Sequence, residues 1–292
     1  MKRGLIMDYF KCAGCEHTYP MIELADISAK IAGRGKRFIC KQCATIKAYS
    51  TANTKEVHKQ ANHGFRFGCE LECVPYSEED KLAMCSSSYN LVPTRDSSLP
   101  FGGVEFKTGI IKNVSGIKSM LRSFESHVDF TAEQCGQHIN FSDMYMSYDE
   151  YDAIRFFADE LFGELCDYMR LHLDEVEKVC GRKPTAYCEL EHRYTGHETW
   201  LNLAHCGYDT KLEKCRIEWR LAKIASPNQY VWLIFMCREM LECIKNNFIA
   251  YLGTDKEDHK TKLTAKKLVK IFQKYADGKA NCQKEKFNSR ER

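Results

Sequence analysis

The sequence predicts an α+β fold in which an antiparallel sheet packs against helices, and three observations support this class. Polar and apolar residues alternate in short segments between Phe65 and Phe141 and again between residues 186 and 221, as expected for strands with one solvated face. Apolar residues at helical spacing are interleaved with these strands. With 292 residues, of which 44% are hydrophobic, the chain can form one large domain and a small appendage.

The N-terminal appendage, residues 1–46, is predicted to be a zinc ribbon held by Cys12, Cys15, Cys40 and Cys43. The two-residue spacer within each Cys-x2-Cys pair lets both thiolates reach one ion, and two pairs complete a tetrahedral site. The 24 residues between the pairs exceed the usual spacing, but the entropy of loop closure grows only with the logarithm of loop length. A closed four-sulfur site has no open position, so this zinc is expected to be structural. Four unconnected thiols are the alternative.

Residues 65–254 are predicted to form the main domain, and the polar residues 47–64 before them a linker. Apolar residues at helical spacing predict a helix near Ser115–His127, inside the strand-rich stretch. Ser147 and Glu150 form a capping box, so a long helix is expected to begin there. Short strands are expected after it, at residues 186–193, 200–204 and 215–221.

The C-terminal part is predicted to be helical and then basic. Ser226 as a cap, followed by Pro227 at the first helical position, predicts a second long helix. Residues 255–292 hold 12 Lys or Arg against 6 Asp or Glu, whereas the net charge of the whole chain is only +3. Such a helical or disordered tail can bind nucleic acid or an acidic partner, and a solvated helix face is the simpler interpretation.

The 16 cysteines are expected to be mainly reduced thiols in the cytoplasm. No long apolar run follows the first basic residues, so no export signal is expected. The longest apolar run, Val231–Cys237, is far shorter than the ~20 residues needed to cross a bilayer. Many cysteines without an export signal favour a reducing compartment and no membrane contact.

Several of the predicted strands place ionisable or amide residues on one alternating face. Carboxylates on the same face repel unless a cation lies between them, and Mg²⁺ with oxygen ligands is the usual cation. Arginines on that face supply forked donors suited to phosphate. Together they predict a site for a metal-bound nucleotide, although each strand alone is also explained as an ordinary amphipathic strand. No P-loop or dinucleotide-binding fingerprint is present. The residues are Glu70, Glu72, Glu105, His138, Asn140, Arg216, Glu218 and Arg220.

The order of these motifs resembles that of the amidoligase family, among the glutamine-synthetase-like carboxylate–amine ligases. The resemblance covers roughly residues 65–252, and its specificity lies in the order of the motifs rather than in any single one. The matching segments are Phe67–Glu72, Asp96–Leu99 leading to Gly103–Phe106, Cys135–Asn140, Arg193–Tyr194, Trp200–Leu203 and Arg216–Arg220.

The resemblance implies a cup-shaped antiparallel sheet, backed by helices, that binds Mg-ATP on its concave face. Such enzymes phosphorylate a carboxylate with ATP, and an amine then attacks the acyl phosphate. Carried onto this chain, the Mg²⁺ ligands are Glu70, Glu72, Glu105 and Glu218. The other implied site residues are Arg193, Arg220 and His138 for catalysis, Asn140, Asn202 and Arg216 for the nucleotide, and Asp96 for the amine or for a turn.

One position departs from the family pattern. The family's Gly-x-His-x-His motif is Gly136-Gln-His138-Ile-Asn140 here. An asparagine can coordinate through its carbonyl oxygen, but it cannot carry a proton near neutral pH. A role that needs the second imidazole is therefore not expected of this chain.

Two alternatives to a ligase remain open at this point. The same fold and metal site can run the reverse reaction, as a hydrolase of amide or isopeptide bonds. The ribbon and the basic tail fit a nucleic-acid-binding protein, although no basic stripe interleaved with aromatic residues is present. As a ligase, the protein is expected to use a carboxylate and an amine substrate, with a protein or another macromolecule docked by the ribbon as one option.

Overall fold

The computed structural model describes residues 9–11, 18–20, 64–85, 91–94, 99, 103–111, 114–132, 134–196, 198–207, 210, 214–249 and 257–278. The four cysteines of the predicted ribbon, Asp96 and residues 47–63 of the predicted linker lie outside the described residues. In the N-terminal part, β1 (Tyr9–Lys11) and β2 (Thr18–Pro20) form an antiparallel pair.

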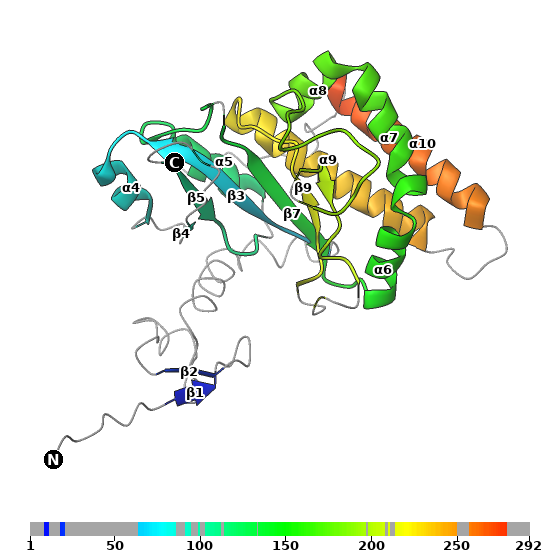
Figure 1. Ribbon diagram of the computed structural model, residues 1–292, viewed down its shortest axis with the longest axis horizontal. Helices are drawn as coiled ribbons and strands as arrows, with labels where there is room; N and C mark the ends of the chain where they lie inside the picture. Colours follow the sequence, from blue (N-terminus) through cyan, green and yellow to red (C-terminus); the bar gives the residue numbers. More distant parts are fainter. Residues whose placement is uncertain are drawn as a thin grey trace, which may run out of the picture.

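The main domain is built on an open antiparallel sheet, in the strand order β4–β5–β3–β7–β9–β8, with β6 paired to β3. The two longest strands, β3 and β7, pair from Phe65 opposite Asp143 to Leu71 opposite Gln137, and they cross the middle of the sheet in Figure 1. The strands are β3 (Phe65–Pro75), β4 (Val92–Thr94), β5 (Val104–Lys107), β6 (Val128–Asp129), β7 (Gln137–Asp143), β8 (Leu201–Asn202) and β9 (Ile217–Trp219).

Helices cover the apolar face of this sheet. The helix α9 contacts β7 and is itself packed against α5, α8 and α10, while α10 also packs against α7. In Figure 1, α9 runs along the sheet and α7 and α10 lie side by side. The helices are α4 (Glu78–Cys85), α5 (Val114–Phe124), α6 (Tyr148–Phe156), α7 (Ala158–Leu171), α8 (Leu173–Cys180), α9 (Pro227–Asn247) and α10 (Glu257–Ala276).

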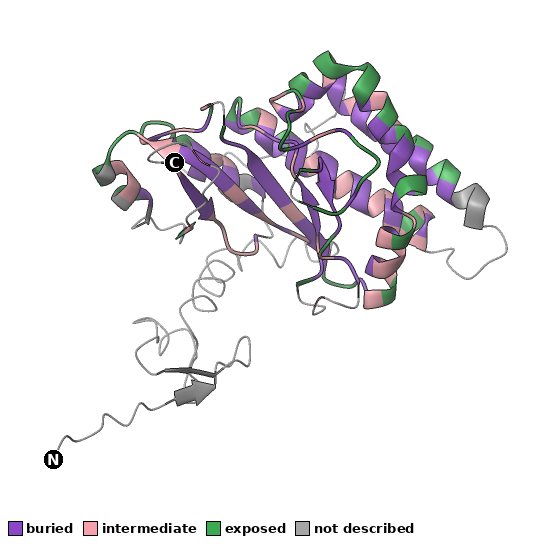
Figure 2. Ribbon diagram, viewed as in Figure 1, coloured by how far each residue is buried: buried purple, intermediate pink, exposed green. Residues whose placement is uncertain are grey.

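The alternation of residues in the strands determines which face is buried under the helices. Cys69, Leu71 and Ile139 are each at most 1% exposed and belong to the hydrophobic core. Since the side-chain period of a strand is two residues, the intervening residues point to the other face. Figure 2 shows burial concentrated along β3 and β7 and on the inner sides of the helices. A slip of one residue would exchange the two faces, so this core fixes the register.

Both predicted helix starts are confirmed. The hydroxyl of Ser147 accepts a hydrogen bond from the backbone N–H of Glu150, whose carboxylate accepts from the N–H of Ser147, at the start of α6. The hydroxyl of Ser226 accepts from the N–H of Gln229 at the start of α9, with Pro227 in the first turn. The single long helix expected after Ser147 is divided into α6, α7 and α8.

The strand predicted at residues 186–193 is wrong, because this stretch forms turns apart from one isolated bridge between Glu189 and Thr199. The backbone N–H of Cys188 bonds to the carbonyl of Thr185 and that of Glu191 to the carbonyl of Glu189, as in turns, while that of Glu189 bonds to the carbonyl of Glu198. The alternation of charges there belongs to a surface loop. The later strands, β8 and β9, are shorter than the predicted 200–204 and 215–221.

The boundary predicted at residue 254 also needs correction, because α10 is part of the packed domain. Leu268 and Phe272 are fully buried and belong to the same core as the sheet. Lys262, Lys266 and Lys270 lie on the outer side of the helix and are exposed. The basic composition of this helix is therefore the solvated face of an amphipathic helix. Within the described residues, no helix is both long and apolar enough to cross a membrane.

Candidate functional site

The polar face of the sheet brings the predicted site residues together from four adjacent strands, β5, β3, β7 and β9, of which all but β7 carry a predicted carboxylate. In the register of the sheet, Glu70 lies opposite both His138 and Lys107, and Glu72 lies opposite Glu105. On the other side of β7, Glu218 lies opposite both Asn140 and Asn202. Every pair in these rows contributes side chains to the same face, because antiparallel partners point the same way.

The centre of this face is a compact group of two carboxylates and one imidazole. The Nδ1 atom of His138 lies 3.4 Å from Oε2 of Glu70 and 3.3 Å from Oε1 of Glu218. One ligand atom from each of the three residues lies within 4.8 Å of the others. The Nε2 atom of His138 is 3.9 Å from Oε1 of Glu72. Three donors this close, from three strands, can be ligands of a single cation.

The pKa values of the neighbouring carboxyl groups of Glu70 and Glu105 are shifted in opposite directions. Burial disfavours the charged form of Glu70, but the hydrogen bond and charge of His138, aided by Glu105 and Lys107, outweigh it and lower its pKa. Burial, followed by the hydrogen bond to Glu70, raises the pKa of Glu105 despite the nearby Lys107. One carboxyl of the pair thus keeps a proton more readily than the other, as expected where like charges meet. A cation between them would relieve the same repulsion.

The carboxylate of Glu72 is held in place by the backbone around β7. Its Oε2 accepts a hydrogen bond from the N–H of Gly136 at 2.5 Å. The side chain of Gln137 donates to the carbonyl of Glu72 at 2.8 Å and accepts from the N–H of Ile224 at 2.6 Å. Glu72, like Glu105 and Glu218, is at most 7% exposed. Buried carboxylates fixed in this way are preorganised for binding.

Arg220 lies at the edge of the centre with a donor unused. Its Nη1 donates to Oε1 of Glu218 at 2.6 Å, while its Nε is buried and has no hydrogen-bond partner in the described part of the chain. Lys107 is a second cation, 3.0 Å from Oε1 of Glu105 and 3.5 Å from Oε2 of Glu70. A buried donor without a partner next to an anionic centre suits an oxygen atom of a bound anion.

Asn140 makes a hydrogen bond with each end of its side-chain amide. Its Nδ2 donates to Oε1 of Glu70 at 3.0 Å, and its Oδ1 accepts from Nε of Arg216 at 2.7 Å. Asn202 donates to Oε2 of Glu218 at 2.9 Å. An amide can accept from an arginine and donate to a carboxylate at once, whereas a protonated imidazole has no acceptor. Asn140 therefore links Arg216 to the centre without needing a proton.

Arg193 is not brought to this centre. Its side chain is 49% exposed and pairs with Glu191 at 3.7 Å and Glu198 at 3.4 Å, in the surface loop before β8. The other sequence-predicted residues of the sheet converge, and Asp96 lies outside the described residues. Lys107 was missed by sequence reasoning, although it follows Glu105 by two positions and so shares its face.

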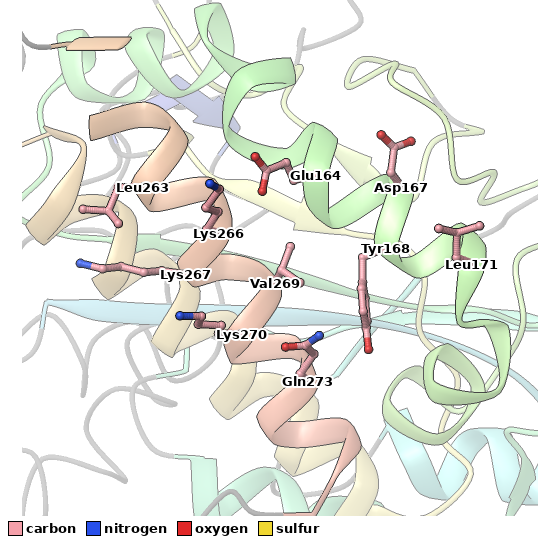
Figure 3. Close-up of a pocket in the computed structure, with 10 residues that line it drawn as sticks. All are labelled: Glu164, Asp167, Tyr168, Leu171, Leu263, Lys266, Lys267, Val269, Lys270 and Gln273. Atoms are coloured by element: carbon pink, nitrogen blue, oxygen red, sulfur yellow. The ribbon is translucent and has the colours of Figure 1, made fainter. Parts of the chain in front are cut away.

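A separate groove of about 570 Å³ lies between α7 and α10, within the helical layer. Figure 3 shows Glu164, Asp167 and Tyr168 of α7 on one side, facing Lys266 and Lys270 of α10. None of the residues that line this groove belongs to the carboxylate centre. The groove is therefore separate from the carboxylate centre.

Comparison with known proteins finds little close similarity. No protein-family model and no curated protein matches the chain. Among solved structures, a glutamine synthetase from Plasmodium falciparum aligns with a TM-score of 0.38 and 13% identity, over 69% of this chain and 55% of that one. The chain thus spans about half the length of that protein. At this TM-score the likeness assigns no function, so the functional conclusion depends on the side chains of the sheet.

Proposed function

We propose that this protein is an ATP- and Mg²⁺-dependent carboxylate–amine ligase that forms an amide bond through an acyl phosphate. The observation that carries the proposal is the convergence of Glu70, His138 and Glu218 on one point of the polar sheet face. Glu72 and Glu105 lie beside them in the same register. A set dominated by carboxylate oxygens suits a hard divalent cation.

The residues present fit such a cation. Lys107 and Arg220 approach the carboxylates to within 3.0 Å and 2.6 Å and offset their charge. The pKa of Glu105 is raised by burial and by its hydrogen bond to Glu70. A buried group of carboxylates that repel one another favours the binding of a further cation such as Mg²⁺, which would polarise a phosphate oxygen when bound.

In this proposal the side chains of the chain bind and orient the reactants. Arg220 uses its free Nε–H to hold an oxygen of the transferring phosphoryl group, where negative charge is greatest. Asn202 fixes Glu218, and Asn140 with Arg216 provides donors for the nucleotide. The γ-phosphoryl group of ATP passes to a carboxylate oxygen as ADP leaves, and the amine then displaces phosphate at the acyl carbon and loses a proton. Asp96 remains a candidate for placing that amine.

Replacing Glu70 with alanine is expected to reduce ADP release at least about 100-fold, because the cation loses a ligand and its neighbours lose their orientation. The measurement is ADP release from Mg-ATP in the presence of a pool of amino acids and amines. Glu164→Ala, an exposed change on α7, serves as the matched control and should retain wild-type activity.

Full activity in the Glu70→Ala protein would show that the carboxylate centre is not the active site. Cleavage of amides without ATP consumption would instead identify a hydrolase on the same scaffold. Nucleic-acid binding that weakens steeply with salt and survives the loss of Glu70 would favour the binding-protein alternative.

We also propose that Cys12, Cys15, Cys40 and Cys43 bind one structural zinc ion, on the basis of their spacing. Metal analysis of the purified full-length chain is expected to find one equivalent of zinc, and Cys40→Ser is expected to lose it. Cys243→Ser changes a thiol of α9 and is the matched control. A chain that contains no zinc as purified from zinc-supplemented medium would contradict the assignment.

A further inference from the structure

The guanidinium of Arg182 lies over Gly136, at one end of the polar sheet face. A Cβ atom added to Gly136 would lie 2.9 Å from Nη1 of Arg182, 3.5 Å from Oε2 of Glu72 and 3.9 Å from Nε2 of His138. The absence of a side chain at Gly136 therefore lets Arg182 reach the edge of the carboxylate centre. Arg182 lies in the loop after α8. The alternation of residues in strands therefore could not predict that it belongs to this face.

The backbone that carries Arg182 is fixed by a turn that requires glycine. Helix α8 ends at Gly181, whose φ of 77° is in the left-handed region. A Cβ there would lie 2.1 Å from the carbonyl oxygen of Lys223. The N–H of Lys223 donates to the carbonyl of Cys180 at 2.7 Å, which ties the turn to the segment that follows β9. Arg182 is thus anchored to the sheet.

Arg182 has donors to spare for a ligand. Its Nη2 donates to Oγ1 of Thr185 at 3.0 Å, and Thr185 is its one hydrogen-bond partner among the described residues. A guanidinium carries five N–H donors in a planar fork that matches a carboxylate or a phosphate. The half-buried Arg182 can therefore bind an anion that approaches Glu72 and its cation.

A second cationic group lies at the other end of the same strand. Arg216 donates to Asn140 and Arg66 donates to Ser142, both on β7. Asn140 is four residues from Gly136, about 14 Å along an extended strand. His138, with the carboxylate centre, lies between these two ends of β7. The polar face thus offers one anion site on each side of the centre.

We infer that Arg182 binds the carboxylate substrate, at the end of β7 opposite the nucleotide. This inference rests on the proposed function, in which Asn140 and Arg216 hold the nucleotide. In phosphoryl transfer the attacking and leaving oxygens lie roughly in line, on opposite sides of phosphorus. A new P–O bond forms to the carboxylate oxygen as the bond to ADP breaks, and ADP takes the electron pair. The carboxylate must therefore approach from the Arg182 end.

The test compares Arg182→Gln with the wild-type protein in two arms, with Arg170→Gln, an exposed change on α7, as the control. One arm measures binding of a fluorescent trinitrophenyl ATP with Mg²⁺. The other measures the half-saturating concentration of the most effective carboxylate in the amino-acid pool, from ADP release. The nucleotide Kd is expected to stay within about twofold, while the half-saturating carboxylate concentration rises about 10- to 100-fold. Gly136→Ala, which displaces Arg182, is expected to shift the same arm.

Each other result overturns the inference. A rise in the nucleotide Kd with no change in the carboxylate arm would assign Arg182 to a phosphate of ATP. If Arg182→Gln changed neither the nucleotide Kd nor the half-saturating carboxylate concentration, Arg182 would have no part in binding. That result would not contradict the proposed function. A wild-type protein that neither binds the nucleotide nor releases ADP would fail the proposed function itself, and the inference with it.

Discussion

Replacing Arg220 with alanine is expected to lower the rate of Mg-ATP-dependent ADP release about 10³-fold. An arginine that neutralises the transferring phosphoryl group contributes about this much or more in phosphoryl transfer. Arg220 is suited to the role because its Nη1 is bonded to Glu218 while its buried Nε has no partner among the described residues. The free donor is thus held next to the proposed cation before any ligand binds, so little reorganisation is needed.

The measurement is single-turnover ADP release at saturating Mg-ATP, which separates chemistry from binding. Arg220→Lys keeps the positive charge but loses the planar set of guanidinium N–H donors. Its rate of ADP release is expected to lie between those of Arg220→Ala and the wild type. Arg238→Ala is the control, because Arg238 lies on α9 and pairs with Glu242 there. A rate for Arg220→Ala within about threefold of wild type would remove Arg220 from the reaction.

Replacing Trp219 with alanine is expected to reduce the free energy of unfolding by about 3–5 kcal/mol. Trp219 is 1% exposed, and its ring packs edge-on against Trp200 with centroids 5.2 Å apart. Its Nε1 donates to the carbonyl of Leu221 at 2.7 Å. The change would leave a large cavity next to Trp200 and a buried carbonyl without its donor.

Urea unfolding followed by circular dichroism measures this loss of stability. Trp232→Ala on α9 is the control, because Trp232 is 39% exposed, and it should change stability by less than about 1.5 kcal/mol. Equal effects of the two changes would mean that Trp219 is not a central core residue. Trp219 follows Glu218 on β9, so one short strand carries both a core residue and a site residue.

The alternation of polar and apolar residues along the strands, with a period of two, predicted most of the site. It placed Glu70, His138 and Glu218 on one face, and the sheet brings them together because its apolar face fixes the register. Arg193 was assigned to the site only by the resemblance, and it lies instead in a surface loop, where it pairs with Glu191. Lys107 could have been found by the same rule, from its position two residues after Glu105.

Arg182 and the packing of α10 could not be predicted, because both depend on contacts between distant segments. Nothing near Arg182 in the sequence shows that its loop crosses Gly136. The lysines of α10 dominated the composition of the C-terminal part, and they concealed the apolar side that includes Leu268 and Phe272. Composition over a window averages the two sides of a helix, whereas packing depends on one of them.

The distance in sequence between Glu70 and Glu218 links ligand binding to the folding equilibrium. Each comes from a different part of the chain, and they meet only when β3, β7 and β9 are aligned. Contacts of this kind form late and slow the folding of a domain. The divalent cation that we propose to bridge them would bind the native state and not the unfolded chain, and at 100 times its Kd it would add about 2.7 kcal/mol to stability. Divalent ions in the growth medium would then raise the yield of folded protein, whether or not substrate is present.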